Sequence, residues 1–177
     1  IDTLIGLHAV KITGTDLEAM GKGGGYSRRQ IEGWCDRYRK ARTWNVGRFE
    51  GVMDWLASHT PEDSAACVIH NDFRFDNVVL DLAEPTRIVG VLDWEMATIG
   101  DPLMDLGNAL AYWVQADDDF FIRSLRRQPT HLPGMLTRRE VVEYYVSKTG
   151  RTPANWAFYE VYGLFRLAAI AQQIYFR

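Results

Sequence analysis

The chain has 177 residues, of which 47% are apolar and 12% aromatic, and its formal net charge is −3. Such a chain can bury a sizeable core, so disorder is excluded, and its charge gives no general attraction to nucleic acid or to an anionic membrane. We see no membrane-spanning run, signal peptide, zinc motif or disulfide framework, and we expect Cys35 and Cys67 to be buried free thiols in the cytoplasm.

The first segment predicts a short helix through Leu4, Leu7 and His8 that ends before Gly14. The letters A-V-K-I around Lys11 look like a kinase strand with its ATP lysine, and the following GKGGGY looks like a phosphate-binding loop. In kinases the glycine-rich loop precedes the lysine strand, and a P-loop requires G-x-x-x-x-G-K-[ST]. We therefore interpret Lys11 as lying past a helix end and GKGGGY as a flexible connection, with substrate contact by that connection as the alternative.

Two helices and a β region follow. Ser27 and Gln30 form a capping-box pattern that opens a helix, and a second helical repeat starts near Phe49 and stops at Pro61. The period then changes, and the short runs ACVIH, NVVLD and RIVGVLDW predict strands over 66–70, 77–81 and 87–94.

The last third predicts helices. Asp101 is a good N-cap for a helix from Pro102, and residues 117–128 carry acids at the front and arginines at the back. Thr137 with Glu140 predicts another capping box, and Gly150 closes that helix. A final helix from about residue 154 is apolar on several sides, so it should lie in the core or, alternatively, pack against further chain. The chain therefore predicts a mostly helical α+β fold in one domain, residues 1–177.

The most informative stretch is VIHNDFRFDNVVLD, residues 68–81, in which a strand enters a polar loop and a strand leaves it. Strand ends hold side chains rigidly, and here they hold Asp72, Asn77 and, from the next strand, Asp93. A carboxylate that orients a hydroxyl, with two oxygen ligands for magnesium, is the set that phosphoryl transfer from Mg-ATP needs.

Two other interpretations of these residues remain. Asp and Asn favour turns, so the three residues could be turn chemistry alone, although this would not explain the strand–loop–strand frame. A metal-dependent phosphohydrolase would need more imidazole ligands, and of the four histidines only His70 lies near the acids in sequence.

The order of three motifs resembles a known family. His70 to Asn77 fits H-x-D-x-x-x-x-N, and L-D-W-E at Asp93 and G-D-P-x-x-D-L at residues 100–106 follow it. Together they are similar to the aminoglycoside phosphotransferase family of small-molecule kinases, in the branch associated with acyl-CoA dehydrogenases. The resemblance implies the large, C-terminal lobe of a protein-kinase-like fold, with short β-hairpins carrying the catalytic loop.

The resemblance also implies roles for residues. Asp72 would be the catalytic aspartate, and Asn77 and Asp93 would bind Mg²⁺ and, through it, the phosphate donor ATP. Arg74 would stabilise charge near the γ-phosphate, with a plain surface cation as the alternative.

Three further residues would support that site. His70 would hold the loop by packing and hydrogen bonding, Asp105 would anchor the loop from the following helix, and Asp101 would cap that helix.

The small lobe with its ATP lysine would lie upstream of Ile1, so we expect a chain truncated at its N-terminus, with truncation at both ends as the alternative. We also expect an apolar surface that faces the small lobe or a partner such as a second copy. The expected activity is phosphorylation of a hydroxyl group on a small-molecule metabolite, with a hydroxyacyl-type compound as one candidate. A non-catalytic kinase-like binding or regulatory module is the alternative. No nucleic-acid or membrane partner is expected.

Overall fold

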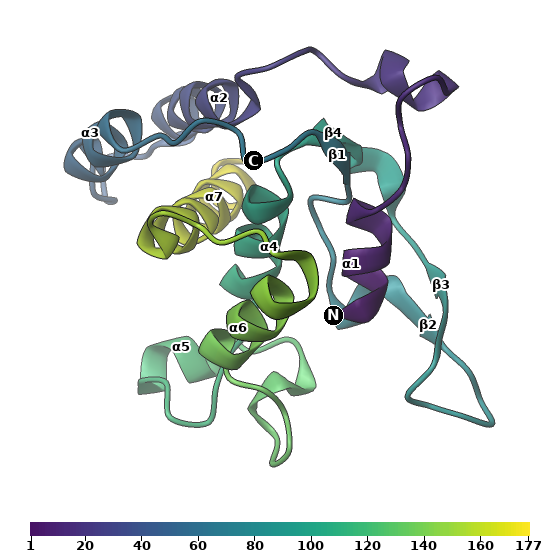
Figure 1. The fold of residues 1–177 in the computed structure, drawn as a ribbon. Helices are drawn as coiled ribbons and strands as arrows, with labels where there is room; N and C mark the ends of the chain where they lie inside the picture. Colours follow the sequence, from purple (N-terminus) through teal and green to yellow (C-terminus); the bar gives the residue numbers. More distant parts are fainter.

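The computed structural model describes residues 1–177 and confirms a mostly helical α+β fold (Figure 1). All four strands lie in the middle of the chain, between the third and the fourth α-helix. The helices are α1 (Asp2–His8), α2 (Tyr26–Ala41), α3 (Glu50–Ser58), α4 (Pro102–Ala111), α5 (Phe120–Ser124), α6 (Arg138–Thr149) and α7 (Trp156–Phe176). The strands are β1 (Cys67–Ile69), β2 (Val78–Leu80), β3 (Ile88–Val91) and β4 (Thr98–Gly100).

The strands form two separate antiparallel pairs, β1 with β4 and β2 with β3. The polar loop 70–77 connects β1 to β2, and the segment 92–97 connects β3 to β4, so both motif segments leave one pair and enter the other. Strand β4 was not predicted, because Thr98–Gly100 contains a single strongly apolar residue, Ile99, and ends in glycine. Its Gly100 lies opposite Cys67, and a Cβ atom there would lie only 2.5 Å from the Ile69 side chain.

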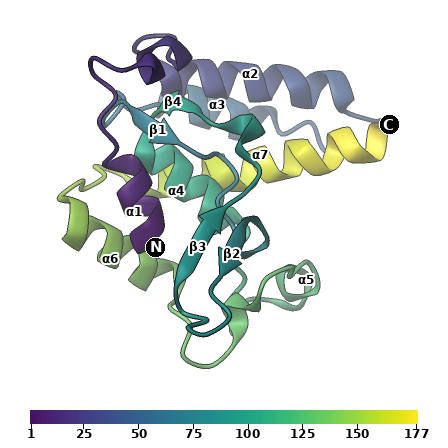
Figure 2. The same cartoon turned by 90° about the vertical axis from the view of Figure 1, so that its right-hand side faces the viewer.

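Helix α4 forms the centre of the core and is buried along nearly its whole length (Figure 1). Helix α7 crosses it so closely that a Cβ atom on Gly107 would lie 2.5 Å from the Tyr159 carbonyl oxygen. A Cβ atom on Gly163 would in turn overlap the Gly107 carbonyl oxygen. The expectation that the last helix belongs to the core is therefore confirmed, and α2 packs along the same helix (Figure 2).

Helix caps predicted for the last third are confirmed. The Asp101 carboxylate accepts from the backbone N–H groups of Leu103 and Met104, as an N-cap does. Thr137 and Glu140 form a reciprocal capping box, and Gly150 closes α6 in the left-handed conformation.

Two predicted helix starts were wrong. The N-cap of α2 is Gly25, and Ser27 already lies inside the helix with its hydroxyl buried and unpaired. The Asp63 carboxylate, from the segment before β1, accepts from the N–H groups of Tyr26 and Ser27 at 2.8 Å each and replaces a local cap. The helix expected from residue 117 begins only after its N-cap Asp119, because Asp118 is drawn into an ion pair with Arg138.

Cys35 and Cys67 are buried free thiols, as predicted. None of the helices has both the length and the apolarity that crossing a membrane requires.

Candidate active site

The loop that follows β1 is anchored by the carboxylate of Asp105. Asp105, fully buried on α4, accepts from the backbone N–H of His70 at 2.8 Å and from that of Asn71 at 2.7 Å. Asn71 adopts a left-handed conformation (φ 67°), which turns the chain sharply just before Asp72. The anchoring role expected for Asp105 is confirmed by these two bonds.

A second residue supports the same carboxylate and was missed by sequence reasoning. His8 of α1 is buried, and its Nε2 lies 3.1 Å from Asp105 Oδ2 while its Nδ1 lies 2.8 Å from the Tyr145 hydroxyl. Because a carboxylate only accepts, Nε2 carries the proton in this pair. In the sequence, His8 is a lone histidine on the apolar face of a short helix, and this pattern does not predict which residue it contacts.

His70 joins the loop to the segment after β3. Its Nε2 donates to the Leu92 carbonyl at 2.8 Å, its Nδ1 accepts from the Asp72 N–H at 3.2 Å, and its ring packs against Trp94. The expectation that His70 packs and hydrogen-bonds to hold the loop is confirmed.

Asp72, Arg74 and Asn77 meet at the Asp72 carboxylate. Oδ2 of Asp72 accepts from Arg74 Nη2 at 3.1 Å and from Asn77 Nδ2 at 3.0 Å. The same Asn77 nitrogen donates to the Asp72 backbone carbonyl at 2.8 Å, so the side chain closes the loop on itself. The carboxylate is mostly buried but keeps 16% of its side-chain surface exposed, and Oδ1 makes no hydrogen bond. One oxygen is therefore fixed by the loop and the other is free.

The Arg74 guanidinium is held in place on three sides. It lies 4.6 Å from the centre of the Tyr112 ring, pairs with Asp72, and approaches Asp76 at 3.7 Å. Burial, followed by the Asp72 charge, raises the pKa of Tyr112 above its usual value. Arg74 is thus a fixed cation beside the Asp72 carboxylate.

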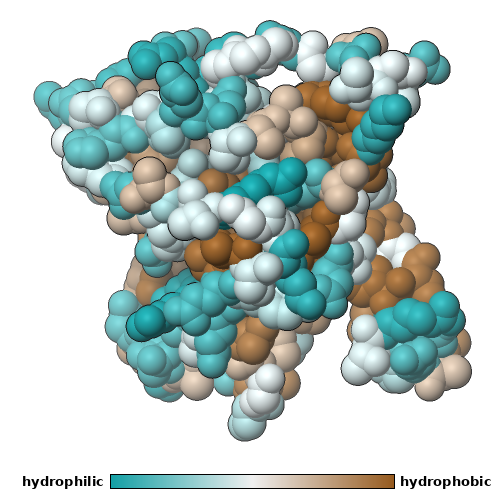
Figure 3. Space-filling model, viewed as in Figure 1, coloured by the Kyte–Doolittle hydropathy of each residue, from teal (hydrophilic) through white to brown (hydrophobic).

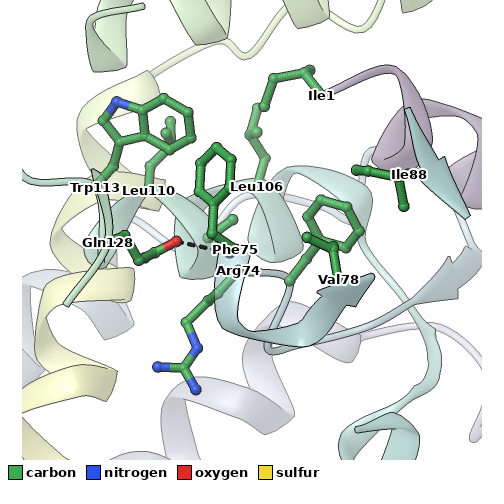
Figure 4. Close-up of a pocket in the computed structure, with 11 residues that line it drawn as sticks. Ile1, Arg74, Phe75, Val78, Ile88, Leu106, Leu110, Trp113 and Gln128 are labelled. Atoms are coloured by element: carbon green, nitrogen blue, oxygen red, sulfur yellow. Dashed lines mark hydrogen bonds between the residues drawn. The ribbon is translucent and has the colours of Figure 1, made fainter. Parts of the chain in front are cut away.

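An apolar cavity of about 90 Å³ lies behind this loop (Figure 4). Phe75 and Trp113 contribute aromatic rings to it, and Arg74 and Gln128 are its polar members. Gln128 Oε1 accepts from the Phe75 N–H at 2.9 Å, the dashed contact in Figure 4. This bond anchors the far side of the loop. The Arg74 guanidinium points away from the apolar side chains in Figure 4.

Asp93 lies next to Asn77 but not at a strand tip. Strand β3 ends at Val91, and Asp93 is a left-handed residue (φ 64°) that begins a short 3₁₀ turn. The N–H of its neighbour Leu92 donates to the Asn77 carbonyl at 2.8 Å, which joins the two segments. The Asp93 side chain is exposed and makes no hydrogen bond or ion pair, so it is available to a ligand.

The oxygen donors suit a hard cation shared with a phosphate. Nowhere in the chain do three or more His, Cys, Asp or Glu side chains gather in a way that could hold a metal by themselves. Mg²⁺ commonly uses one or two protein oxygen ligands together with substrate phosphates and waters. With its nitrogen committed to Asp72, Asn77 keeps Oδ1 for a ligand, and Asp93 adds a carboxylate, so the residues fit Mg²⁺ bound with a nucleotide.

Known proteins are similar to this chain in sequence and in fold. The chain is 35% identical over 173 residues to mouse acyl-CoA dehydrogenase family member 10 and 32% identical over 184 residues to mouse family member 11, with 97% and 99% of the chain covered. A Ralstonia eutropha structure described as a candidate aminoglycoside phosphotransferase matches 98% of the chain with a TM-score of 0.80 and 30% identity.

The chain corresponds to only part of each relative. It spans 16% and 23% of the two mouse proteins and 53% of the Ralstonia chain. The family model described as the phosphotransferase enzyme family, APH, matches residues 1–141. The chain therefore belongs to the APH phosphotransferase family, with a kinase-like fold and relatives among the acyl-CoA dehydrogenase family members 10 and 11.

Proposed function

We propose that this chain carries the catalytic loop of an ATP- and Mg²⁺-dependent kinase that phosphorylates a hydroxyl group of a small metabolite. The observation that carries the proposal is the Asp72 carboxylate, which Arg74 and Asn77 hold by one oxygen while the other oxygen stays free. A hydroxyacyl-type acceptor is the substrate class that fits the acyl-CoA dehydrogenase relatives.

Each side chain has a task in this reaction. Asp72 Oδ1 accepts a hydrogen bond from the acceptor hydroxyl, orients its oxygen for attack, and takes its proton late in the step. Asn77 and Asp93 would hold Mg²⁺, which would neutralise charge on the phosphates of ATP, the donor of the phosphoryl group. Arg74 stabilises negative charge that develops beside Asp72.

The small ATP-binding lobe would come from a further part of a longer protein, as the coverage of the relatives suggests. A non-catalytic binding module would need the fold but not the free Asp72 oxygen or the uncommitted Asp93 carboxylate. Both groups are in place, which favours the enzyme.

The test is phosphate transfer from ATP by the full-length protein. Asp72→Asn should lower kcat by about 10²–10⁴-fold, the range for loss of a general base, and leave the unfolding midpoint nearly unchanged. Equal turnover of ATP by wild type and Asp72→Asn would remove the assignment.

Two further variants separate the metal role from general charge effects. Asp93→Asn should weaken the Mg²⁺ dependence of nucleotide binding, measured by titration. Glu84→Gln, an exposed acid at the tip of the β2–β3 hairpin, is the matched control and should behave like wild type.

A further inference from the structure

Arg166 of α7 is a buried cation without a carboxylate partner. It is 2% exposed, yet no Asp or Glu pairs with it, whereas Arg74 and Arg138 pair with acids. Its one hydrogen bond runs from Nη2 to the Met96 sulfur at 3.6 Å, and a thioether is a weak acceptor. Burial of a charge is costly when no opposite charge compensates it, so this position needs an explanation.

No carboxylate lies within ion-pair distance of Arg166, and Asp72 and Asp105 act on tyrosines that Arg166 also affects. Its guanidinium lies 5.2 Å from the centre of the Trp34 ring, a cation–π contact that compensates part of the burial. Trp34 Nε1 and the Tyr162 hydroxyl are enclosed and make no hydrogen bond of ordinary geometry. Trp34 and Asn108 are the polar side-chain neighbours of the Tyr162 hydroxyl, so the Arg166 guanidinium is the group that lacks a matching acceptor.

This cluster lies beside the catalytic loop. Met96, which contacts Arg166, accepts through its backbone carbonyl from Asn71 Nδ2 at 2.9 Å, and Asn71 precedes Asp72. Burial and then the Asp72 charge raise the pKa of Tyr112, and the charges of Arg166 and Arg74 oppose this rise. Both cations therefore act on the same tyrosine.

Arg166 reaches this region from helix α7, whereas Asn77 and Asp93 flank the β2–β3 hairpin. Helices α2 and α7 run together, and the β2–β3 hairpin that leads to Asn77 and Asp93 lies below them in Figure 2. An anion at Arg166 would be held from helix α7 and not by Asn77 or Asp93, and occupation of the nucleotide site in the test below separates the two.

We propose that Arg166, supported by Trp34, binds an anionic group of the acceptor substrate, a carboxylate or a phosphate, while the acceptor hydroxyl meets Asp72. The inference rests on the proposed function and narrows its acceptors to anionic hydroxy compounds. A planar guanidinium matches the paired oxygens of such groups, and an anchor away from the reacting atom orients the hydroxyl.

The first test measures anion binding without turnover, using the full-length protein. Acetate and inorganic phosphate, with acetamide as the neutral isostere, are titrated at low ionic strength, and apparent affinities are taken from shifts of the unfolding midpoint. Saturating Mg²⁺ and a non-hydrolysable ATP analogue occupy the nucleotide site. We expect at least one of the two anions, but not acetamide, to raise the midpoint, and the more effective anion identifies the group that the acceptor carries.

Variants assign the effect to one residue. Arg166→Gln should lower the apparent anion affinity at least tenfold, since a charged hydrogen bond is lost. Arg37→Gln is the matched control, because Arg37 lies 4.6 Å from the same Trp34 ring but is exposed. If Arg166→Gln does not fold, Arg166→Lys keeps the charge and the aliphatic stem, and the loss of the planar fork should still weaken binding.

Turnover adds a readout that a purely structural arginine would not move. Arg166→Lys should raise KM for a hydroxycarboxylate and leave KM for its amide unchanged, with kcat altered much less. The inference is overturned if the unfolding midpoint of the wild type does not shift with anions, or if the nucleotide analogue abolishes that shift. It is also overturned if Arg166→Gln and Arg37→Gln change the apparent anion affinity equally. Because anion binding is read without phosphate transfer, an inactive protein would count against the proposed function and not against this site.

Discussion

At the scale of single residues, the loop over residues 70–77 is positioned by buried contacts from distant parts of the chain. Asp105 holds two backbone N–H groups of the loop, and His8, 97 residues away in sequence, supports the same carboxylate. The residues of the loop itself were predictable because their spacing within one strand–loop–strand segment reflects the chemistry. His8 and Arg166 were not, because a lone polar residue on an apolar helix face has no pattern that names its partner.

Asp105→Asn tests this anchoring. The amide replaces one acceptor oxygen with a donor that faces donors, so we expect the free energy of unfolding to fall by about 1–3 kcal/mol, the cost of leaving a buried hydrogen-bonding group unpaired. Urea unfolding of the purified variant measures this value. Asp36→Asn, an exposed acid paired with Lys40, is the control and should change stability by less than about 0.5 kcal/mol. Similar losses in the two variants would contradict a special role for Asp105.

At the scale of helices and strands, local patterns predicted most elements, and long-range contacts decided where they begin. The capping boxes and N-caps at Thr137 and Asp101 involve neighbours within one turn, so the sequence pattern was sufficient. The start of α2 depends on Asp63, 36 residues beyond Ser27, and no local pattern contains that contact. Strand β4 exists only because β1 lies beside it.

The remote cap at α2 makes a pH-dependent prediction. Burial raises the pKa of Asp63, but the N–H groups of Ser27 and Tyr26 outweigh it and hold the pKa below its usual range. A lowered pKa stabilises the fold above the unfolded value of about 3.9, and that stability is lost as pH falls through the folded pKa. Asp63→Asn should therefore cost about 1 kcal/mol at pH 7, as loss of a cap does, and the difference from wild type should shrink below about pH 4.

Denaturant unfolding at neutral and acidic pH checks this prediction. Glu62→Gln, the exposed neighbouring acid, serves as the control and should follow wild type at both values. A gap between Asp63→Asn and wild type that stays constant on acidification would argue against a charged cap.

The crossing of α4 and α7 makes a second prediction at this scale. Alanine favours a helix more than glycine does, yet a Cβ atom on Gly163 would overlap the Gly107 carbonyl. We expect Gly163→Ala to lower the free energy of unfolding by about 2–3 kcal/mol, because the helices must move apart. Gly51→Ala on α3, where nothing lies within 4 Å, should raise it by up to about 1 kcal/mol. Thermal unfolding of the two variants measures these changes. If Gly163→Ala stabilised the fold as Gly51→Ala does, the helices would not cross closely.

At the scale of the whole molecule, the chain buries a continuous core but leaves an apolar strip exposed. Leu82, Val89, Leu92 and Trp94, on or after the β2–β3 hairpin, are 101%, 52%, 51% and 44% exposed. Figure 3 shows apolar surface along this hairpin beside its charged tip. Composition alone could not locate such a strip, because which apolar residues stay outside depends on how the strands pair. Exposed apolar patches of this kind mark contact surfaces, and a small lobe that completes an ATP site would lie next to Asn77 and Asp93.

If a further part of a longer protein covers this strip, its side chains should be protected there. Carbene footprinting of residues 1–177 and of the full-length protein, read by mass spectrometry, compares labelling residue by residue. We expect Val89, Leu92 and Trp94 to be labelled several-fold less in the full-length protein, because packed apolar side chains exclude the reagent along with water. Trp44, which is 92% exposed on the connection after α2, is the internal reference for reagent dose. Equal labelling of the strip in both proteins would mean that the rest of the polypeptide docks elsewhere, and the ATP lobe would then have to reach Asp93 without covering the hairpin.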